Sequence, residues 1–540
     1  MAGSTVGLDE WRIVFENVAR EDLRNICLVS KSFNFLATPL LYRSISLTKT
    51  TYVFLKHEKQ EPDLTRGHWN LLSRLEDDKN DSIRGFVQEL NLLRVQRELL
   101  PVVLDWRFIQ RLQERDCLLG LIDRLPNLRK VNLGVSGFQT DEMIRAIGAH
   151  KAGPELILDL TGGDCLSIDG PLPFVRGLRI SASPVCPNDG SRPEILEVQR
   201  LLFNCSNLRS FSLRVNRPYG GCVMGGLLRS TWMGSFRLTG EEEFPALEEL
   251  ALDGYRMDDD EWMHWRDRFQ WSNLLTLAIG PQATSKLLGH FAGYSTSLKT
   301  LRVFAYAGEG KPDHRELERF LMSFDTLTTL ELKGYICSVD AIGHHMDMET
   351  LFLHEDEPTG KGIQRRVFTA QELDYLDERC PRLRSLAVDI QRGEDILPDD
   401  VLRKLATGFR CLNSLSIHFE LGLTDLKHPI RPLLNYESAQ GIGQALFDQR
   451  RFSGLDTSTS YTSYTVKLWT GKSFRRHPQW EPVYSRFEKR FTATYEISDP
   501  ASDPCLRRLD GDERGRRGAV SDRVHVKGPQ LNYVGYLSSI

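Results

Sequence analysis

The stretch LRKVNL, residues 128–133, contains the pattern that decides the fold of this 540-residue chain. Its apolar residues are Leu128, Val131 and Leu133, which are separated first by two polar residues and then by one. Alternation of apolar and polar residues is typical of a β-strand that buries one face. The pattern therefore predicts a short, half-buried strand, and its recurrence along the chain decides the architecture.

The same pattern recurs through most of the sequence. Eight further clear copies lie at residues 208–213, 247–252, 274–279, 298–303, 327–332, 348–353, 383–388 and 412–417. Three weaker copies lie at residues 87–92, 155–160 and 175–180. The middle apolar residues of the twelve copies run from Leu90 to Leu415 at an average spacing of about 30 residues, close to the length of a leucine-rich repeat.

Segments with helical periodicity lie between the strand patterns. In TAQELDYLDERC (369–380) and DDVLRKLATGF (399–409), apolar residues recur three and four positions apart. One helix–strand unit cannot bury its apolar face alone, whereas stacked units bury a continuous core. The sequence therefore predicts an α/β solenoid with parallel strands. The alternative is a doubly wound α/β enzyme, which would be expected to carry a glycine-rich phosphate turn after an early strand; the sequence shows no such turn.

The repeated units resemble leucine-rich repeats of the irregular, ribonuclease-inhibitor-like type. This resemblance implies a solenoid, expected over residues 48–480, whose strand face binds another protein. Residues 481–540 are expected to form a C-terminal cap and a tail. Within that tail, the charged, Pro- and Gly-containing stretch from Ser498 to Lys527 is expected to be mobile.

The composition excludes several classes of protein. The chain has 69 Lys and Arg against 73 Asp and Glu, so it lacks the basic excess typical of nucleic-acid binding. It shows neither a secretory leader nor an apolar run of about 20 residues. Its ten cysteines include no Cys-x-x-Cys pair, a usage that suits a reducing compartment. We therefore expect a cytoplasmic or nuclear protein with no membrane, nucleic-acid, metal or cofactor partner.

The first 47 residues have a different pattern, which predicts three short helices. Apolar residues at helical spacing occur in VGLDEWRIVFENV (6–18), REDLRNICLV (20–29) and SKSFNFLA (30–37), and Pro39 is expected to end the third helix. A module of this size is too small to bury a comfortable core by itself. It is therefore expected to pack against another surface.

This N-terminal module resembles an F-box. The resemblance lies in the apolar helix from Trp11 to Val18, the Asp22-Leu23 pair, LVSKSF (28–33) and PLLYRSISL (39–47). Where the family usually opens with Leu-Pro, this chain has Val6 and Gly7, and it places the charged Glu10 where an aliphatic residue is usual.

The F-box resemblance implies that residues 1–47 dock onto a Skp-type adaptor and, through it, onto a cullin-RING ubiquitin ligase of the SCF type. The physical basis would be helix-in-groove packing with apolar anchors. The residues expected to divide between adaptor contacts and the core of the module are Trp11, Val14, Phe15, Leu23, Leu28, Val29, Phe33, Leu36 and Leu40. The alternative is that these helices form only the N-terminal cap of the solenoid.

The polar positions that flank the middle apolar residue of each strand are expected to face a protein client. Phe304 beside Arg302, and Phe352 beside His354, are predicted to be exposed anchors, because aromatic residues and Arg dominate binding hot spots. The full set of candidate client contacts is Arg214, Asp253, Arg302, Phe304, Lys333, Phe352 and His354.

The sequence predicts no enzyme. WTGKSF (469–474) resembles the end of a phosphate-binding loop, but Val466 occupies the position of its first glycine. His344 and His345 precede a strand pattern in what is expected to be a solvated turn rather than a metal site. The predicted function is therefore that of a non-enzymatic substrate receptor for ubiquitin-dependent degradation, and the alternative is a leucine-rich-repeat scaffold with no connection to a ubiquitin ligase.

Overall fold

The structure is a computed structural model. It describes residues 7–49, 71–77, 81–94, 115–134, 140–160, 166, 168–182, 195–215, 235–255, 257–280, 284–305, 314–334, 336–355, 357, 365–391, 397–422, 430–431, 433–454, 464–471, 492–498 and 506–508. The chain divides into two compact units, Met1–Leu247 and Glu248–Ile540.

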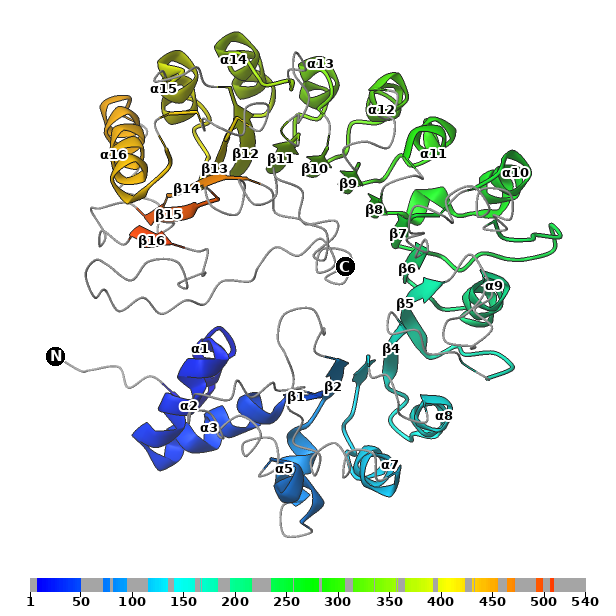
Figure 1. The fold of residues 1–540 in the computed structure, drawn as a ribbon. Helices are drawn as coiled ribbons and strands as arrows, with labels where there is room; N and C mark the ends of the chain where they lie inside the picture. Colours follow the sequence, from blue (N-terminus) through cyan, green and yellow to red (C-terminus); the bar gives the residue numbers. More distant parts are fainter. Residues whose placement is uncertain are drawn as a thin grey trace, which may run out of the picture. The chain divides into compact units, whose positions relative to one another are not determined.

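The first unit begins with helices and continues as alternating strands and helices. Its elements are α1 (Leu8–Glu16), α2 (Arg20–Val29), α3 (Lys31–Tyr42), β1 (Ser44–Lys49), α5 (Asp81–Phe86), β2 (Glu89–Arg94), α7 (Arg115–Asp123), β3 (Lys130–Leu133), α8 (Thr140–Ala149), β4 (Glu155–Leu160), β5 (Val175–Ala182), α9 (Ile195–Asn204) and β6 (Ser210–Val215). Strands β1 to β6 pair in sequence order, and every pair is parallel. Helices α7 to α9 lie on one side of these strands (Figure 1).

The second unit repeats the helix–strand arrangement. Its elements are β7 (Glu249–Asp253), α10 (Asp259–Arg268), β8 (Thr276–Ile279), α11 (Thr284–Phe291), β9 (Thr300–Phe304), α12 (His314–Leu321), β10 (Thr329–Lys333), α13 (Val339–Gly343), β11 (Thr350–His354), α14 (Ala370–Arg379), β12 (Ser385–Ile390), α15 (Asp399–Thr407), β13 (Ser414–Phe419), α16 (Tyr436–Phe452), β14 (Thr465–Thr470), β15 (Thr494–Ser498) and β16 (Leu506–Arg508). Strands β7 to β14 are parallel, and β15 and β16 extend the sheet antiparallel. Helices α10 to α16 lie on one side of the strands (Figure 1).

The twelve predicted strands are confirmed as β2 to β13. In β9, β10 and β11 the middle apolar residues Leu301, Leu330 and Leu351 lie side by side in register. Each of these three side chains is at most 1% exposed. Within each unit, the apolar positions of the repeat thus form a core between strands and helices. The chain is an α/β protein with a mostly parallel sheet.

Two features of the fold differ from the sequence-based expectations. Pro39 lies inside α3, which continues to Tyr42, so the prediction that Pro39 ends this helix is wrong. Residues 44–47, assigned to the helical module, begin strand β1 and pair with β2. Most of the stretch predicted to be a mobile tail lies outside the described residues.

Within the described part of the chain, no helix has the length and apolar character needed to cross a bilayer. The described thiols of Cys205, Cys337 and Cys380 are buried, and burial raises the pKa of each to about 12. These three thiols therefore stay protonated and are unsuited to act as nucleophiles.

Candidate functional site

Helices α1 to α3 share a small core of their own. Phe15, Leu23 and Ala37 are buried at its centre. The Phe33 ring centroid lies 5.0 Å from that of Trp11 and 5.1 Å from that of Phe15, distances typical of packed aromatic pairs. Leu36 and Leu40 are partly buried against the same cluster. Six of the nine predicted adaptor-or-core residues therefore contribute to the interior of the module.

The other three predicted residues, Val14, Leu28 and Val29, point to solvent. Leu28 is 85% exposed and Val29 is 67% exposed. Three further apolar side chains of the module that the sequence did not single out, Leu8, Ile13 and Phe35, are exposed as well. Of the fourteen large apolar side chains exposed among the described residues, six thus belong to this short module. Exposed apolar groups gathered in one place mark an interaction site more often than scattered ones do.

The corner between α2 and α3 holds Leu28 and Val29 in place. Ser30 caps α3, because its Oγ accepts a hydrogen bond from the backbone N–H of Phe33 at 3.1 Å. The Asn34 side chain donates to the carbonyl oxygen of Cys27 at 3.1 Å and so ties α3 back to α2. The exposed pair therefore sits on a corner that is fixed by hydrogen bonds.

Glu10, the charged residue that departs from the F-box pattern, has a local structural role. Its carboxylate accepts a hydrogen bond at 2.7 Å from the backbone N–H of Gly7, which is the N-cap residue of α1. This is the acidic half of a capping box; glycine has no side chain to supply the other half. Val6 lies outside the described residues. Glu10 thus stabilises the N-terminus of α1 in this chain, which lacks the usual Leu-Pro opening.

The helical module is joined directly to the first strand. Only Arg43 separates α3 from β1, and its carbonyl oxygen accepts hydrogen bonds from the N–H groups of Gln88 and Glu89 at 2.9 and 3.0 Å. The Tyr42 hydroxyl also accepts a hydrogen bond from the Arg74 guanidinium at 2.6 Å. These bonds attach the end of α3 to the sheet of the first unit.

The predicted client residues are less exposed than expected. Arg214, Asp253, Arg302 and Phe352 are half-buried, whereas Phe304, Lys333 and His354 are buried. The prediction that Phe304 and His354 are exposed is wrong: they are 2% and 5% exposed. For Phe304 the reason is packing, because its ring lies in a cluster with Ala251 and Ala278, whose small side chains leave room for it.

Four of the predicted client residues do come together on strands β9 to β11. The Lys333 ammonium lies 5.1 Å from the ring centroid of Phe304 and 4.6 Å from that of Phe352, within cation–π range. It also lies 3.8 Å from Glu331, whose other carboxylate oxygen is 3.2 Å from Arg302. Burial lowers the pKa of Lys333 to about 8. Arg214 belongs to the other unit.

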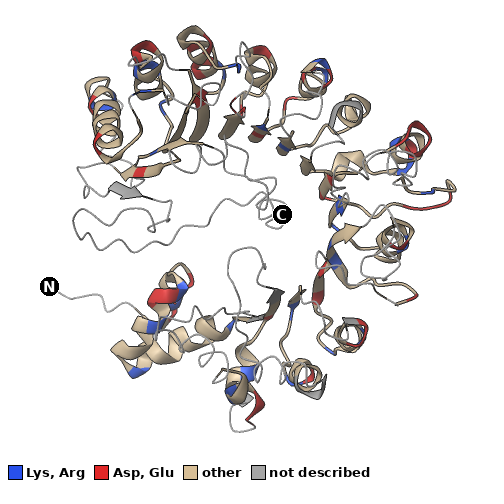
Figure 2. Ribbon diagram, viewed as in Figure 1, with Lys and Arg blue, Asp and Glu red and all other residues tan. Residues whose placement is uncertain are grey.

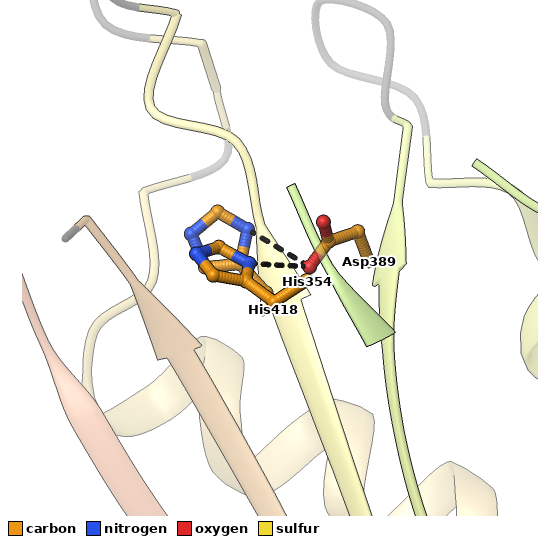
Figure 3. Close-up of side chains that lie close together, drawn as sticks. All are labelled: His354, Asp389 and His418. Carbon is orange, nitrogen blue, oxygen red and sulfur yellow. Dashed lines mark hydrogen bonds and ion pairs between the residues drawn. The ribbon is translucent and has the colours of Figure 1, made fainter. Parts of the chain in front are cut away.

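The seventh candidate, His354, belongs to a buried cluster at the carboxyl ends of β11, β12 and β13 (Figure 3). Its Nδ1 lies 2.8 Å from Oδ1 of Asp389, and Nδ1 of His418 lies 3.7 Å from the same oxygen. The other oxygen of Asp389 accepts a hydrogen bond from the backbone N–H of Glu355 at 2.7 Å. In-register parallel strands produce this convergence, since Asp389 and His418 are direct partners in the β12–β13 ladder.

Arg365 supplies the positive charge of the cluster, and sequence patterns did not reveal it. Its Nη1 lies 2.8 Å from Nδ1 of His418 and 3.1 Å from Oδ2 of Asp389, and its Nε donates to Glu420 at 2.5 Å. Its Nη2 donates to the carbonyl oxygen of Ile390 at 3.0 Å. Arg365 lies just before α14 rather than in a strand, so no strand pattern could have marked it.

Burial and neighbouring charges together set the pKa values of Asp389 and His418. Burial alone would raise the pKa of Asp389, but the neighbouring His354 and Arg365 outweigh it and hold that pKa far below its usual range. Burial and then the charge of Arg365 hold the pKa of His418 well below its usual value. His418 is therefore neutral near pH 7, and its Nδ1 can accept the hydrogen bond from Arg365.

No protein-family model matches the chain, and no curated protein matches it. Figure 2 shows acidic and basic residues interspersed over the described helices and strands of each unit.

Among the described residues, two groups have the chemistry of a binding site. They are the exposed apolar residues of the helical module and the polar groups at the ends of β9 to β13.

Proposed function

We propose that this chain is the substrate-recognition subunit of an SCF-type ubiquitin ligase. In this proposal helices α1 to α3 are an F-box that binds a Skp-type adaptor and, through it, a cullin. The helix–strand units are irregular leucine-rich repeats that bind a protein client, and the complex acts in the cytoplasm or nucleus. The chain itself performs no chemistry, because ubiquitin transfer belongs to other subunits.

The concentration of exposed apolar side chains on the helical module is the observation that carries this proposal. A module that served only to cap the sheet would be expected to turn polar residues toward solvent. Here the module packs an aromatic core inside and still exposes Leu28, Val29 and Phe35. Such side chains are the apolar anchors that a helix-binding groove requires. The F-box-like order of residues in the sequence selects a Skp-type adaptor as the partner.

The test is binding of the purified full-length chain to a purified Skp-type adaptor. The double change Leu28→Gln and Val29→Gln keeps side-chain bulk and helix propensity while removing both apolar surfaces. We expect the affinity to fall about tenfold or more, as for central interface anchors. Because both side chains face solvent, the melting temperature should stay within about 1–2 °C of the wild type.

Phe452→Gln is the matched control, because Phe452 is 92% exposed and lies at the end of α16, far along the chain from the module. This variant should bind the adaptor like the wild type. Equal loss of binding in both variants, or no loss in the double variant, would overturn the proposed contact. A wild-type chain that binds client proteins but no adaptor would instead indicate a repeat scaffold unconnected to ubiquitin transfer.

A further inference from the structure

The carboxyl ends of β11, β12 and β13 carry a donor set that suits a transition metal. Nitrogen and oxygen atoms of His354, Asp389 and His418 all lie within 4.8 Å of one another, and the three residues are buried. Two imidazoles and one carboxylate are a usual ligand set for zinc and for non-haem iron. Among the described residues, these three form the one group of His, Cys, Asp or Glu side chains whose potential ligand atoms lie this close together.

The surroundings of the donors also resemble those of a metal centre. Nε2 of His418 lies 3.2 Å from the carbonyl oxygen of Gly471, to which it can donate its proton. A hydrogen bond at that nitrogen orients the ring and leaves Nδ1 as the ligand atom. The backbone N–H of Glu355 fixes the far oxygen of Asp389, so that Oδ1 faces the two imidazoles. The donors are therefore held by their own outer partners.

A cation from the chain already uses one of these donor atoms. Nη1 of Arg365 lies 2.8 Å from Nδ1 of His418 and 3.1 Å from Oδ2 of Asp389, the oxygen of that carboxylate that does not face the imidazoles. A metal ion bound at Nδ1 of His418 would need the same lone pair, and it would bring two positive charges against the guanidinium. A buried guanidinium with this many hydrogen bonds is not displaced cheaply. The arrangement thus favours the internal cation over an external one.

We propose that His354, Asp389 and His418 form a latent transition-metal site that is plugged by the guanidinium of Arg365. With Arg365 in place, the cluster is a latch that holds the backbone before α14 to the ends of three strands. Without the guanidinium, Asp389 is a buried carboxylate beside two imidazoles, and a divalent metal such as Zn²⁺ or Co²⁺ becomes the available counter-charge. Metal binding would require Nδ1 of His354 to release its proton or pass it to Nε2.

The experiment is titration of the full-length chain with Co²⁺, whose visible absorption reports nitrogen and oxygen ligands. Arg365→Ala should bind one Co²⁺ per chain, and binding should be about 100-fold or more tighter than to the wild type, because an uncompensated buried charge is costly. The double variant Arg365→Ala with His418→Ala should lose this binding, since it retains only two of the three ligands. Excess Zn²⁺ should displace the Co²⁺ and abolish the absorption.

Arg365→Met guards against a variant that fails to fold, because methionine retains much of the side-chain volume without the charge. Zn²⁺ should raise the melting temperature of the folded Arg365 variants and leave that of the wild type unchanged. Equal Co²⁺ affinity for the wild type and the Arg365 variants would overturn the plug. Absence of stoichiometric binding in both folded Arg365 variants would overturn the latent site.

Discussion

At the residue scale, burial decides the chemical behaviour of several side chains more than their identity does. His345 and His344 are neighbours in the turn before β11, yet His345 is fully buried and His344 is exposed. The His345 ring packs 5.2 Å from the ring of Phe324. Burial, followed by the charge of His344, lowers the pKa of His345 to about 4. The prediction of a solvated turn is thus correct for His344 but wrong for His345, which belongs to the core.

This burial makes an acid-sensitive contribution to stability. A histidine whose pKa is lowered from about 6.5 to about 4 binds fewer protons in the folded chain than in the unfolded chain between these values. The stabilisation is therefore fully present above about pH 6.5 and is lost as the pH falls toward 4, with about 2 kcal/mol gone by pH 5. His345→Leu should remove this part of the pH dependence in urea unfolding measured at pH 7 and pH 5.

His344→Leu is the control for that measurement, since it changes the exposed ring alone. It should retain the wild-type difference between pH 7 and pH 5. If His345→Leu loses as much stability on acidification as the wild type, the buried imidazole is not the source of the acid sensitivity.

At the scale of the element, helix α3 carries two phenylalanines with different surroundings. Phe33 packs against Trp11 and Phe15 inside the module, whereas Phe35, two residues later, is 75% exposed. Helical geometry turns these positions about 200° apart, so one helix can serve the core and the surface at once. The sequence suggested apolar roles for Trp11, Phe15 and Phe33, but helical spacing alone could not say which of them face inward.

Phe33→Ala should destabilise the module locally. The half-buried ring leaves a cavity when it is removed, at a cost of about 2–3 kcal/mol. Hydrogen exchange of the amides in α1 to α3 should therefore accelerate while the amides of β8 to β13 keep their protection. Phe35→Ala, a change of the same size on the same helix, should leave exchange unchanged. Equal acceleration in both variants would contradict the aromatic core.

The strands show where sequence patterns succeed. Apolar residues at the middle position of each repeat mark β2 to β13 because burial on one face requires an apolar residue at each such position. Strand β1 was missed because it follows α3 after a single residue, so that its buried Ile45 and Leu47 read as the end of the helical module. The polar ends of the strands were misjudged for another reason. Their exposure depends on residues such as Arg365, which come from loops without periodicity.

At the scale of the whole molecule, the proposed function assigns different roles to the helical module and to the helix–strand units. In the proposed function, the exposed apolar side chains of the helical module bind an adaptor, and the polar and aromatic groups at the strand ends bind a client. Within the second unit, the cluster of Arg365, Asp389 and His418 already satisfies its own donors and acceptors. In the proposed function the half-buried Arg302 and Phe352 are therefore the stronger candidates for client contact in that unit.

The most direct measurement of the central claim is recovery of partners with the full-length chain from cells, followed by mass spectrometry. The account predicts that the wild-type chain brings down a Skp-type adaptor together with a cullin. It also predicts that the Leu28→Gln and Val29→Gln double variant loses both, while Phe452→Gln retains both. Recovery of neither subunit with the wild type, or undiminished recovery with the double variant, would contradict the claim that the exposed helical module connects this chain to a ubiquitin ligase.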